Sequence, residues 1–172
     1  MVTPIILPEF MLEDRRCPFH GLAFVLVNDG CRLEAEVLSR KILLGKIHRA
    51  TVTAADVNYM GSITVDPLLI EASGLLPLEE VEVWDVTNGE RFSTYCLPGK
   101  PGDGRVTVNG AAARRVTVGD KVIVAAYGMI DQESLGLHEA RVAVPDDANH
   151  LVRSFTYCAN LVTRAFEIRE ST

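Results

Sequence analysis

Short runs of apolar and β-branched residues, separated by turn residues, make up the middle of this chain. The segment KIHRATVTA at 46–54 is rich in β-branched residues, which favour strands, and SITVD at 62–66 is a second run of this kind. KVIVAAY at 121–127 is almost wholly apolar, as expected of a strand that is buried on both faces. Further alternating or apolar runs occur at 80–83, 91–97 and 105–108. The pattern predicts about six or seven strands and a small, mainly β fold.

One short helix is marked by residues that are typical of helix ends. Asp66 suits the N-cap, Pro67 suits the first helical position, and Gly74 suits the position after the last turn. These signals predict a helix over the segment PLLIEAS, which links the predicted strand at 62–66 to the one at 80–83.

The C-terminal part of the chain carries weaker signals. DQESLGLHEA at 131–140 has a helical pattern, although Gly136 disfavours a helix. The run LVRSFTYCANLVTRAFEI at 151–168 suits either a helix or a strand. We therefore expect three parts, namely an N-terminal extension at 1–40, a β-rich domain at 41–150 and a C-terminal tail at 151–172.

Composition narrows the classes of function. The chain has 172 residues, of which 48% are hydrophobic, and a net charge of -6. This acidic balance argues against a nucleic-acid partner, because such proteins present basic residues to phosphate. The four cysteines lack C-x-x-C spacing and the four histidines are scattered, so neither a metal site nor a disulfide framework is predicted. The early apolar run at 22–27 is too short to span a membrane, and we expect a cytoplasmic protein.

Several motifs follow one another along the middle of the chain. They are GKIHRATVTAADVNYMGSITVD at 45–66, NGERFSTY at 88–95, VNGAAAR at 108–114 and VGDKVIVAAY at 118–127, with a weaker likeness in RVAVPDDAN at 141–149. Their order and spacing resemble those of the pyruvoyl-dependent L-aspartate 1-decarboxylase family. The resemblance implies a double-ψ β-barrel with one or two short helices, assembled as a homotetramer with active sites between subunits. It also implies decarboxylation of L-aspartate to β-alanine and CO2, which supplies a precursor of pantothenate and coenzyme A.

The family makes its cofactor from its own backbone, and the matching bond here is Gly61–Ser62. In that chemistry the Ser62 hydroxyl attacks the Gly61 carbonyl carbon, and β-elimination leaves dehydroalanine, which hydrolyses to a pyruvoyl group and ammonia. Glycine permits close approach and serine supplies the nucleophile, so the residue types suit the reaction. The resemblance implies that Thr94 donates to the oxyanion on Gly61, and that neither a metal nor PLP takes part. Taken alone, Gly-Ser is a common turn, and only the surrounding motifs favour cleavage.

The resemblance also implies roles for the residues that bind and convert the substrate. The pyruvoyl group on Ser62 forms a Schiff base with the substrate amine, and Tyr95 donates the proton that completes the reaction. Arg91 and Lys46 are the candidate cations for the two carboxylates of aspartate. The other candidate site residues are His48, Tyr59, Asn109, Gly110, Ala111 and Ala112. Without the resemblance, Tyr95 is interpreted as a core or barrel-rim aromatic. Lys46 and His48 are then interpreted as surface charges, and Asn109-Gly110 as a turn.

The sequence alone leaves alternative functions open. One is a non-enzymatic double-ψ barrel that serves as a binding module, and another is a pyruvoyl decarboxylase for a different amino acid. The joint presence of the candidate residues favours the decarboxylase over the binding module. The features that decide this are the Gly61–Ser62 bond, Arg91, Thr94, Tyr95 and Asn109. Residues 1–40 match no motif, so they form either a genuine extension or a stretch upstream of a translation start near Val37 or Leu38. Maturation is either spontaneous or assisted by a helper protein.

Overall fold

The computed structural model describes residues 22–27, 30–35 and 38–170, and the chain divides into two compact units. The first unit spans Met1–Leu38 and the second spans Ser39–Thr172. All of the motifs that carry the family resemblance lie in the second unit.

The described part of the first unit is a two-stranded hairpin. Its strands are β1 (Leu22–Val27) and β2 (Gly30–Ala35), which pair antiparallel with Leu22 opposite Ala35. Residues 1–21 of the predicted extension lie outside the described residues, and so does Val37, one of the two alternative start positions.

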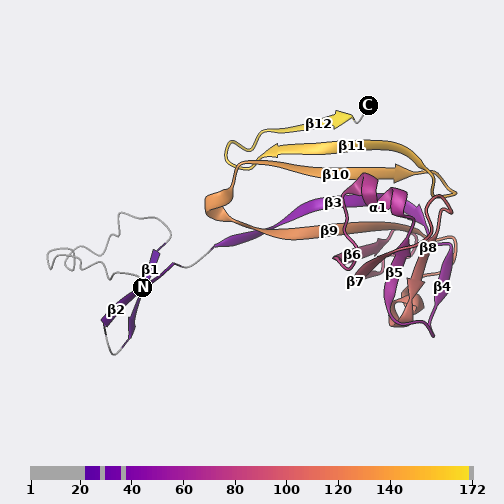
Figure 1. Ribbon diagram of the computed structural model, residues 1–172, viewed down its shortest axis with the longest axis horizontal. Coiled ribbons are helices and arrows are strands. Elements are labelled where there is room, and N and C mark those ends of the chain that lie inside the picture. The colour runs from indigo at the N-terminus through magenta and orange to yellow at the C-terminus, as the bar shows by residue number, and fades with distance from the viewer. Residues whose placement is uncertain (1–21, 28–29, 36–37, 171–172) are drawn as a thin grey trace. The chain divides into compact units, whose positions relative to one another are not determined.

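The second unit is built on one mixed sheet of ten strands. The strands are β3 (Ser39–Thr51), β4 (Ala54–Asp56), β5 (Ser62–Val65), β6 (Glu80–Asp85), β7 (Arg91–Pro98), β8 (Val106–Asn109), β9 (Lys121–Asp131), β10 (Leu137–Pro145), β11 (Leu151–Asn160) and β12 (Phe166–Glu170). Their order in the sheet is β12-β11-β10-β3-β9-β6-β7-β5-β8-β4. Figure 1 shows β3, β9, β10 and β11 as long neighbouring strands, with β4 to β8 gathered toward one end. The predicted mainly β fold is confirmed.

The chain between β3 and β4 connects strands that lie far apart in the sheet order. β3 pairs with β9, whereas β4, which follows after two residues, pairs with β8. Between them, Val52 N donates to Asp120 O at 2.8 Å and Thr53 N donates to Val106 O at 2.8 Å. The sheet therefore curls until β8 meets the chain that leaves β3, which is consistent with the predicted double-ψ β-barrel.

The predicted helix forms where its end signals place it. α1 (Pro67–Ser73) begins after Asp66, whose Oδ1 accepts from Leu68 N at 3.0 Å, and ends at Gly74, whose φ is 72°. The Asp66 carboxylate also accepts from the N–H groups of Gly102 and Gly104. Burial opposes ionisation of Asp66, but these three backbone donors outweigh burial and hold its pKa below the ordinary value. Asp66 thus caps α1 and ties it to the chain before β8.

A single apolar core lies between the sheet and α1. Strand side chains that alternate in toward it supply most of its volume, and the helix adds Leu69 and Ile70. The strand residues that are fully buried include Ile47, Ile63, Val65, Val81, Val83, Cys96, Val106, Val108, Val122 and Val124. Gly45 of β3 lets the helix approach closely, because a Cβ there would lie 2.0 Å from Ser73 O.

The predicted helix at 131–140 is wrong. Only Gln132–Ser134 form a single 3-10 turn, η3, and β10 begins at Leu137. β10 pairs antiparallel with β11, the next strand along the chain, and in parallel with β3, which lies far away in the sequence, so strand pairing satisfies its backbone groups. The run at 151–168, which suited either structure, forms β11 and most of β12, and both strands continue the same sheet beyond residue 150.

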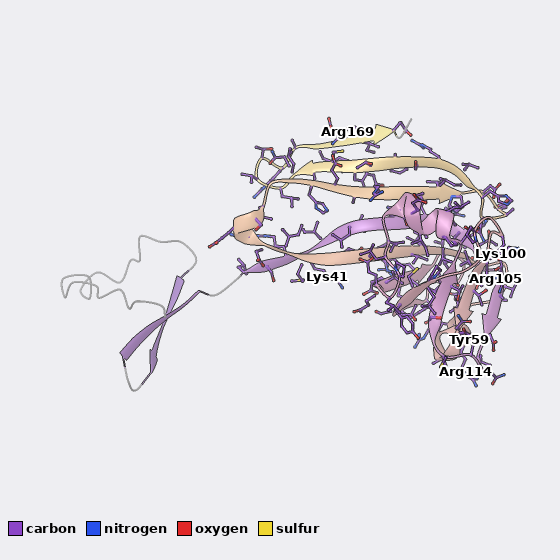
Figure 2. All side chains as sticks on the ribbon, in the orientation of Figure 1. Lys41, Tyr59, Lys100, Arg105, Arg114 and Arg169 are labelled. Carbon is purple, nitrogen blue, oxygen red and sulfur yellow. The ribbon has the colours of Figure 1, made fainter. Side chains whose placement is uncertain are left out.

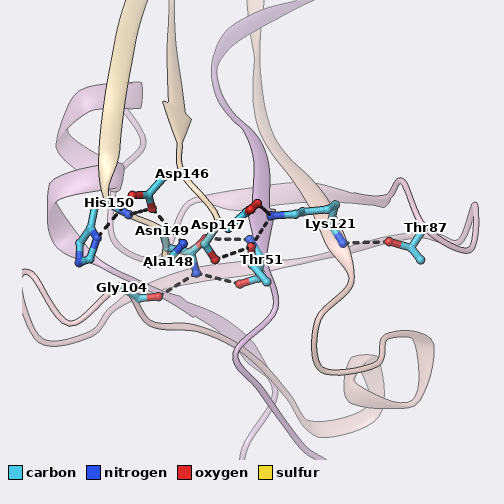
Figure 3. A network of polar contacts seen from close by, with 9 residues as sticks. All are labelled: Thr51, Thr87, Gly104, Lys121, Asp146, Asp147, Ala148, Asn149 and His150. Carbon is cyan, nitrogen blue, oxygen red and sulfur yellow. Dashed lines mark hydrogen bonds and ion pairs between the residues drawn. The ribbon is translucent and has the colours of Figure 1, made fainter.

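A buried asparagine fixes the end of β3 to the chain before β8 (Figure 3). The Asn149 side chain donates from Nδ2 to Thr51 O and to Gly104 O, each at 2.8 Å, and accepts from Thr51 N at 2.7 Å. Asn149 has a φ of 65°, a conformation that asparagine tolerates better than most residues. Lys121 Nζ adds bonds to Thr51 Oγ1 and Asp147 Oδ1, both at 2.6 Å. This network holds four separate segments in one place, namely the end of β3, the chain at Gly104, the chain at 147–149 and the start of β9.

Candidate active site

Ser62 and Asn109 lie side by side at the ends of neighbouring strands. Ser62 is the first residue of β5 and Asn109 is the last residue of β8, and the two are partners in the antiparallel register. Asn109 Nδ2 donates to Ser62 Oγ at 2.9 Å and to Thr64 Oγ1 at 3.1 Å. Ser62 is 0% exposed and Asn109 is 3% exposed. One amide group therefore orients two hydroxyls, of which that of Ser62 is shielded from solvent.

This arrangement prepares the Ser62 hydroxyl to act as a nucleophile. A hydrogen bond donated to the oxygen favours its ionised form, and the bond is stronger when the oxygen carries charge. Thr64, which no motif had singled out, keeps the Asn109 amide turned toward both oxygens. The alternation of side chains along a strand could have suggested it, because Thr64 is two residues after Ser62 on the same face.

The backbone after β8 packs against the predicted cleavage bond. Gly110 begins the 3-10 segment η2 (Gly110–Arg115) with a φ of 67°. A Cβ at Gly110 would lie 2.8 Å from Gly61 Cα, 3.0 Å from Gly61 N and 3.2 Å from Tyr59 O. No side chain larger than hydrogen fits at Gly110 unless the Gly61 backbone moves. Position 110 thus requires glycine both for its conformation and for this contact.

The other residues of the two loops are more open to solvent. Tyr59, predicted to wall the site, has a side chain that is 52% exposed in a single chain. Ala111 is exposed and Ala112 is partly buried against the core. Figure 2 shows Tyr59 and Arg114, which belongs to η2, at the same end of the molecule.

β7 runs parallel to β5 and brings Thr94 and Tyr95 level with the cleavage bond. Ile63 of β5 pairs with Cys96 of β7. Continuing this register back along both strands places Tyr95 level with Ser62, and Thr94 level with Gly61. Gly61 and Ser62 thus directly precede the first paired residue of β5, and Thr94 and Tyr95 directly precede that of β7.

Strand alternation divides these β7 residues between two faces of the sheet. Phe92, Thr94 and Cys96 point toward the core, whereas Arg91 and Tyr95 belong to the exposed face. Tyr95 is 39% exposed, consistent with a side chain that reaches a solvent-accessible site. Because Ser62 is level with Tyr95, the Ser62 side chain belongs to the face that Arg91 and Tyr95 share.

Trp84 of β6 supports Arg91. The two residues are partners in the β6–β7 register, and the Arg91 guanidinium lies 5.0 Å from the centroid of the Trp84 ring. A guanidinium stacked on an aromatic face is held in orientation while its N–H groups stay free to bind an anion. Trp84 was missed from the sequence, since a single tryptophan on a strand gives no sign of what lies opposite.

Lys46 and His48 lie on another part of the sheet. Both belong to β3, which is separated from β5 by β9, β6 and β7 in sheet order. Among the described residues, no hydrogen bond or ion pair joins either side chain to Ser62, Arg91 or Tyr95. Lys46 and His48 thus come from a different strand than Arg91 and Tyr95, the other polar candidates for substrate handling.

His48 is an uncharged neighbour of Lys46 at neutral pH. Burial, together with the positive charges of Lys46 and Arg49, lowers the pKa of His48 below its ordinary value. Its Nδ1 atom is buried and has no hydrogen-bond partner among the described residues. His48 is thus unsuited to hold a substrate carboxylate by charge, and Arg91 and Lys46 are the remaining candidates.

Two further features bear on the class of protein. Within the part of the chain that the structure describes, no group of three or more His, Cys, Asp and Glu side chains gathers in a way that could hold a metal ion. The helices found among these residues are all too short or too polar to cross a bilayer.

Comparison with known sequences decides the family. The sequence model of the aspartate decarboxylase family matches residues 38–152, from the start of β3 into β11. The chain belongs to the aspartate decarboxylase family. Aspartate 1-decarboxylases of Listeria welshimeri and Listeria monocytogenes are each 50% identical to it over 112 residues, which cover 65% of this chain and 88% of the relative. That of Caldicellulosiruptor saccharolyticus is 50% identical over 113 residues, with 66% and 88% covered.

The aspartate decarboxylase match contains every candidate site residue, from Lys46 to Ala112. It leaves out the first unit, most of β11 and all of β12. Contacts made by residues after 152 therefore lie outside the part of the chain that the family model matches.

Proposed function

We propose that this chain is a self-processing aspartate 1-decarboxylase, which cuts itself between Gly61 and Ser62 and then converts L-aspartate to β-alanine and CO2. The observation that carries the proposal is the buried Ser62 hydroxyl, held 2.9 Å from Asn109 Nδ2 directly after a glycine. A serine in an ordinary surface turn would instead face water. The relatives at 50% identity are named aspartate 1-decarboxylases, which supports aspartate as the substrate.

Self-cleavage requires only groups of this chain and water. Ser62 Oγ bonds to the Gly61 carbonyl carbon as the C–N bond breaks, so the amide becomes an ester and the Ser62 amine is released. Loss of the Ser62 Cα proton expels the Gly61 carboxylate, and water then replaces nitrogen, which leaves as ammonia. Asn109 stabilises negative charge on Ser62 Oγ, and Thr94, level with Gly61, donates to the oxyanion on the carbonyl oxygen.

The surroundings of residue 62 fit a pyruvoyl group made in place. The position is fully buried, the Asn109 amide lies beside its side chain, and Gly110 presents no Cβ toward the adjoining backbone. When formed, the group supplies a carbonyl that withdraws electrons from the substrate as CO2 leaves. The proposal assigns no role to a metal or to PLP.

Tyr95 and Arg91 handle the substrate from the face that they share with Ser62. The Tyr95 phenol donates the proton that replaces CO2 on the substrate carbon. Arg91, held against Trp84, binds one substrate carboxylate through two parallel hydrogen bonds. Tyr59, Ala111 and Ala112 enclose the site in the proposal, since their loops adjoin Gly61 and Gly110.

A second copy of the chain supplies Lys46, and His48 beside it. In this proposal the protein is a homotetramer whose active sites lie between subunits, so that Lys46 of one copy reaches Ser62 of another. Among the described residues, Lys46 contacts Tyr157 and makes no hydrogen bond to Ser62, which is consistent with this division of the site. Lys46 then provides the second cation that a dicarboxylic substrate requires.

The intact mass of the purified protein tests the proposal. We expect two chains, residues 1–61 and 62–172, with the larger one lighter than a serine-ended chain by one ammonia and without a free amino terminus. Purified from a host that lacks its own decarboxylase, the protein should release β-alanine from L-aspartate and nothing from L-alanine, which has no second carboxylate. An active preparation that contains only uncut chain would overturn the proposal. Uncut and inactive protein that is cleaved on addition of a cell extract would instead indicate a helper protein.

A further inference from the structure

Lys46 lies over the face of an aromatic ring from the C-terminal part of the chain. Its Nζ atom is 5.1 Å from the centroid of the Tyr157 ring, within the range of a cation–π contact. Tyr157 belongs to β11 and follows the last residue of the family match, which ends at 152. Both side chains are partly buried.

The sheet register places these two side chains on one face. Gly45 of β3 faces α1, so Lys46, the next residue, points to the other face of the sheet. Lys46 is the partner of Val142 on β10, and Val142 is the partner of Phe155 on β11. Tyr157 is two residues after Phe155 and therefore shares its face. The contact results from regular strand pairing rather than from a flexible loop.

Aromatic neighbours hold the Tyr157 ring in place. The Phe155 ring lies 5.3 Å from it at an interplanar angle of 63°, an edge-to-face packing. Phe166 of β12 lies 5.5 Å from it on the neighbouring strand. A ring fixed between two others offers a defined surface for the lysine, which otherwise has four flexible side-chain bonds.

Lys46 differs from other lysines of the sheet in what it contacts. Lys41 pairs with Glu82 and Lys121 pairs with Asp147. No carboxylate forms an ion pair with Lys46 among the described residues, where its contact is the Tyr157 ring. A ring orients the ammonium group without neutralising it, so all three N–H donors stay available to an incoming carboxylate.

We propose that Tyr157 is a positioning residue, which holds the Lys46 ammonium group ready to bind a carboxylate of the substrate. This inference rests on the proposed function and extends its site to Tyr157, which lies beyond the segment that the family model matches. Tyr157 itself does not touch the reacting atoms. It restricts the conformations of the Lys46 side chain before the substrate binds, so that less conformational entropy is lost on binding.

Kinetics of position 157 variants test this role. Tyr157→Leu removes the ring, and it should raise KM for L-aspartate about 3- to 30-fold while kcat and self-cleavage stay near wild type. Tyr157→Phe keeps the ring face and should restore KM. Tyr127→Leu is the matched control, because Lys41 lies 5.2 Å from the Tyr127 ring but is not a substrate-binding candidate. Its KM should equal that of the wild type.

Other outcomes would overturn the role of Tyr157. An unchanged KM in Tyr157→Leu, or a Tyr157→Phe variant as impaired as Tyr157→Leu, would exclude it. If Tyr157→Leu does not fold, fluorinated phenylalanines at position 157 keep the shape of the ring and weaken its attraction for cations stepwise. KM should then rise with each added fluorine, and a constant KM would refute the inference. A wild-type protein that makes no β-alanine would overturn the proposed function itself.

Discussion

Asn109 Nδ2 donates a hydrogen bond of 2.9 Å to Ser62 Oγ, and both side chains are buried. The same amide nitrogen lies 3.1 Å from Thr64 Oγ1. The serine that is proposed to attack its own backbone is thus held by a neutral donor in a dry site, before any charge develops. Such a donor acts most strongly on the charged state through which the reaction passes.

Replacing Asn109 should therefore slow self-cleavage. Asn109→Ala removes the donor to Ser62 Oγ and should lower the cleavage rate by about 10²- to 10³-fold, as for other preorganised donors. Thr64→Val is the control, because it removes an acceptor of the same amide and leaves the Ser62 bond intact. The fraction of uncut chain on a denaturing gel, followed over time, measures both. Equal cleavage by Asn109→Ala and wild type would show that Asn109 is not needed for this step.

Gly110→Ala should block or strongly slow cleavage. The new Cβ would lie 2.8 Å from Gly61 Cα, so the cleavage bond must move away from Ser62 Oγ and Thr94. Gly102→Ala is the matched control, because Gly102 also has a positive φ, at 76°, but has no atom within 4 Å of the added Cβ. Both variants should lose about 1–2 kcal/mol of stability because an L-residue is strained at positive φ, whereas only Gly110→Ala should accumulate uncut chain. Normal processing of Gly110→Ala would mean that Gly61 tolerates displacement.

Thr94 and Tyr95 should separate the two reactions. Thr94→Ala removes the proposed donor to the Gly61 oxyanion and should impair cleavage. Tyr95→Phe should cleave normally, because the phenol proton is not used in the acyl shift, but should lower kcat for β-alanine release by about 10²- to 10⁴-fold. Gels report cleavage and product assays report turnover on the same preparations. Wild-type turnover by cleaved Tyr95→Phe would exclude Tyr95 as the proton donor and direct attention to Asn109.

Asp85→Asn should stabilise the protein at neutral pH. Asp85 is 3% exposed, and its pKa is raised by burial and by the neighbouring Asp120 carboxylate, although N–H donors of Thr87 and Asn88 offset part of this. A raised pKa in the folded state means that stability falls as pH rises above the ordinary value of 3.8 and Asp85 loses its proton. Asparagine keeps the acceptor oxygen and carries no charge.

The melting temperature of Asp85→Asn should exceed that of the wild type by a few degrees at pH 7. In a protein of this size, each kcal/mol of added stability raises the melting temperature by about 2–4 °C. The difference should shrink toward pH 4, where the wild-type carboxyl regains its proton. A difference that is the same at both pH values would show that ionisation of Asp85 is not its cause.

The N-terminal unit should be dispensable. The family match begins at residue 38, and the second compact unit begins at Ser39. A shortened protein that starts at Leu38 should fold, cleave itself and turn over L-aspartate at the rate of the full chain. Solubility, gel pattern and β-alanine release would be compared directly. Loss of any one of them would assign residues 1–37 a structural or functional role.

The sequence by itself determined the local elements and the family. Asp66, Pro67 and Gly74 define α1 because capping depends on residues within one turn of the helix end. Runs of apolar, β-branched or alternating residues located β5 to β9 because a strand shows its pattern along its own length. The ordered motifs identified the aspartate decarboxylase family, and with it the residues to inspect.

Only the tertiary structure decided which residues meet. It turned 137–145 into β10, against a helical pattern, because backbone pairing with β3 and β11 outweighs weak local preference. It also placed Asn109 on Ser62, Gly110 on Gly61, Trp84 under Arg91 and Tyr157 under Lys46. Each of these contacts joins different strands or loops, and its geometry follows from strand register and sheet curvature. Those depend on hydrogen bonds between distant segments, which no local pattern of residues records.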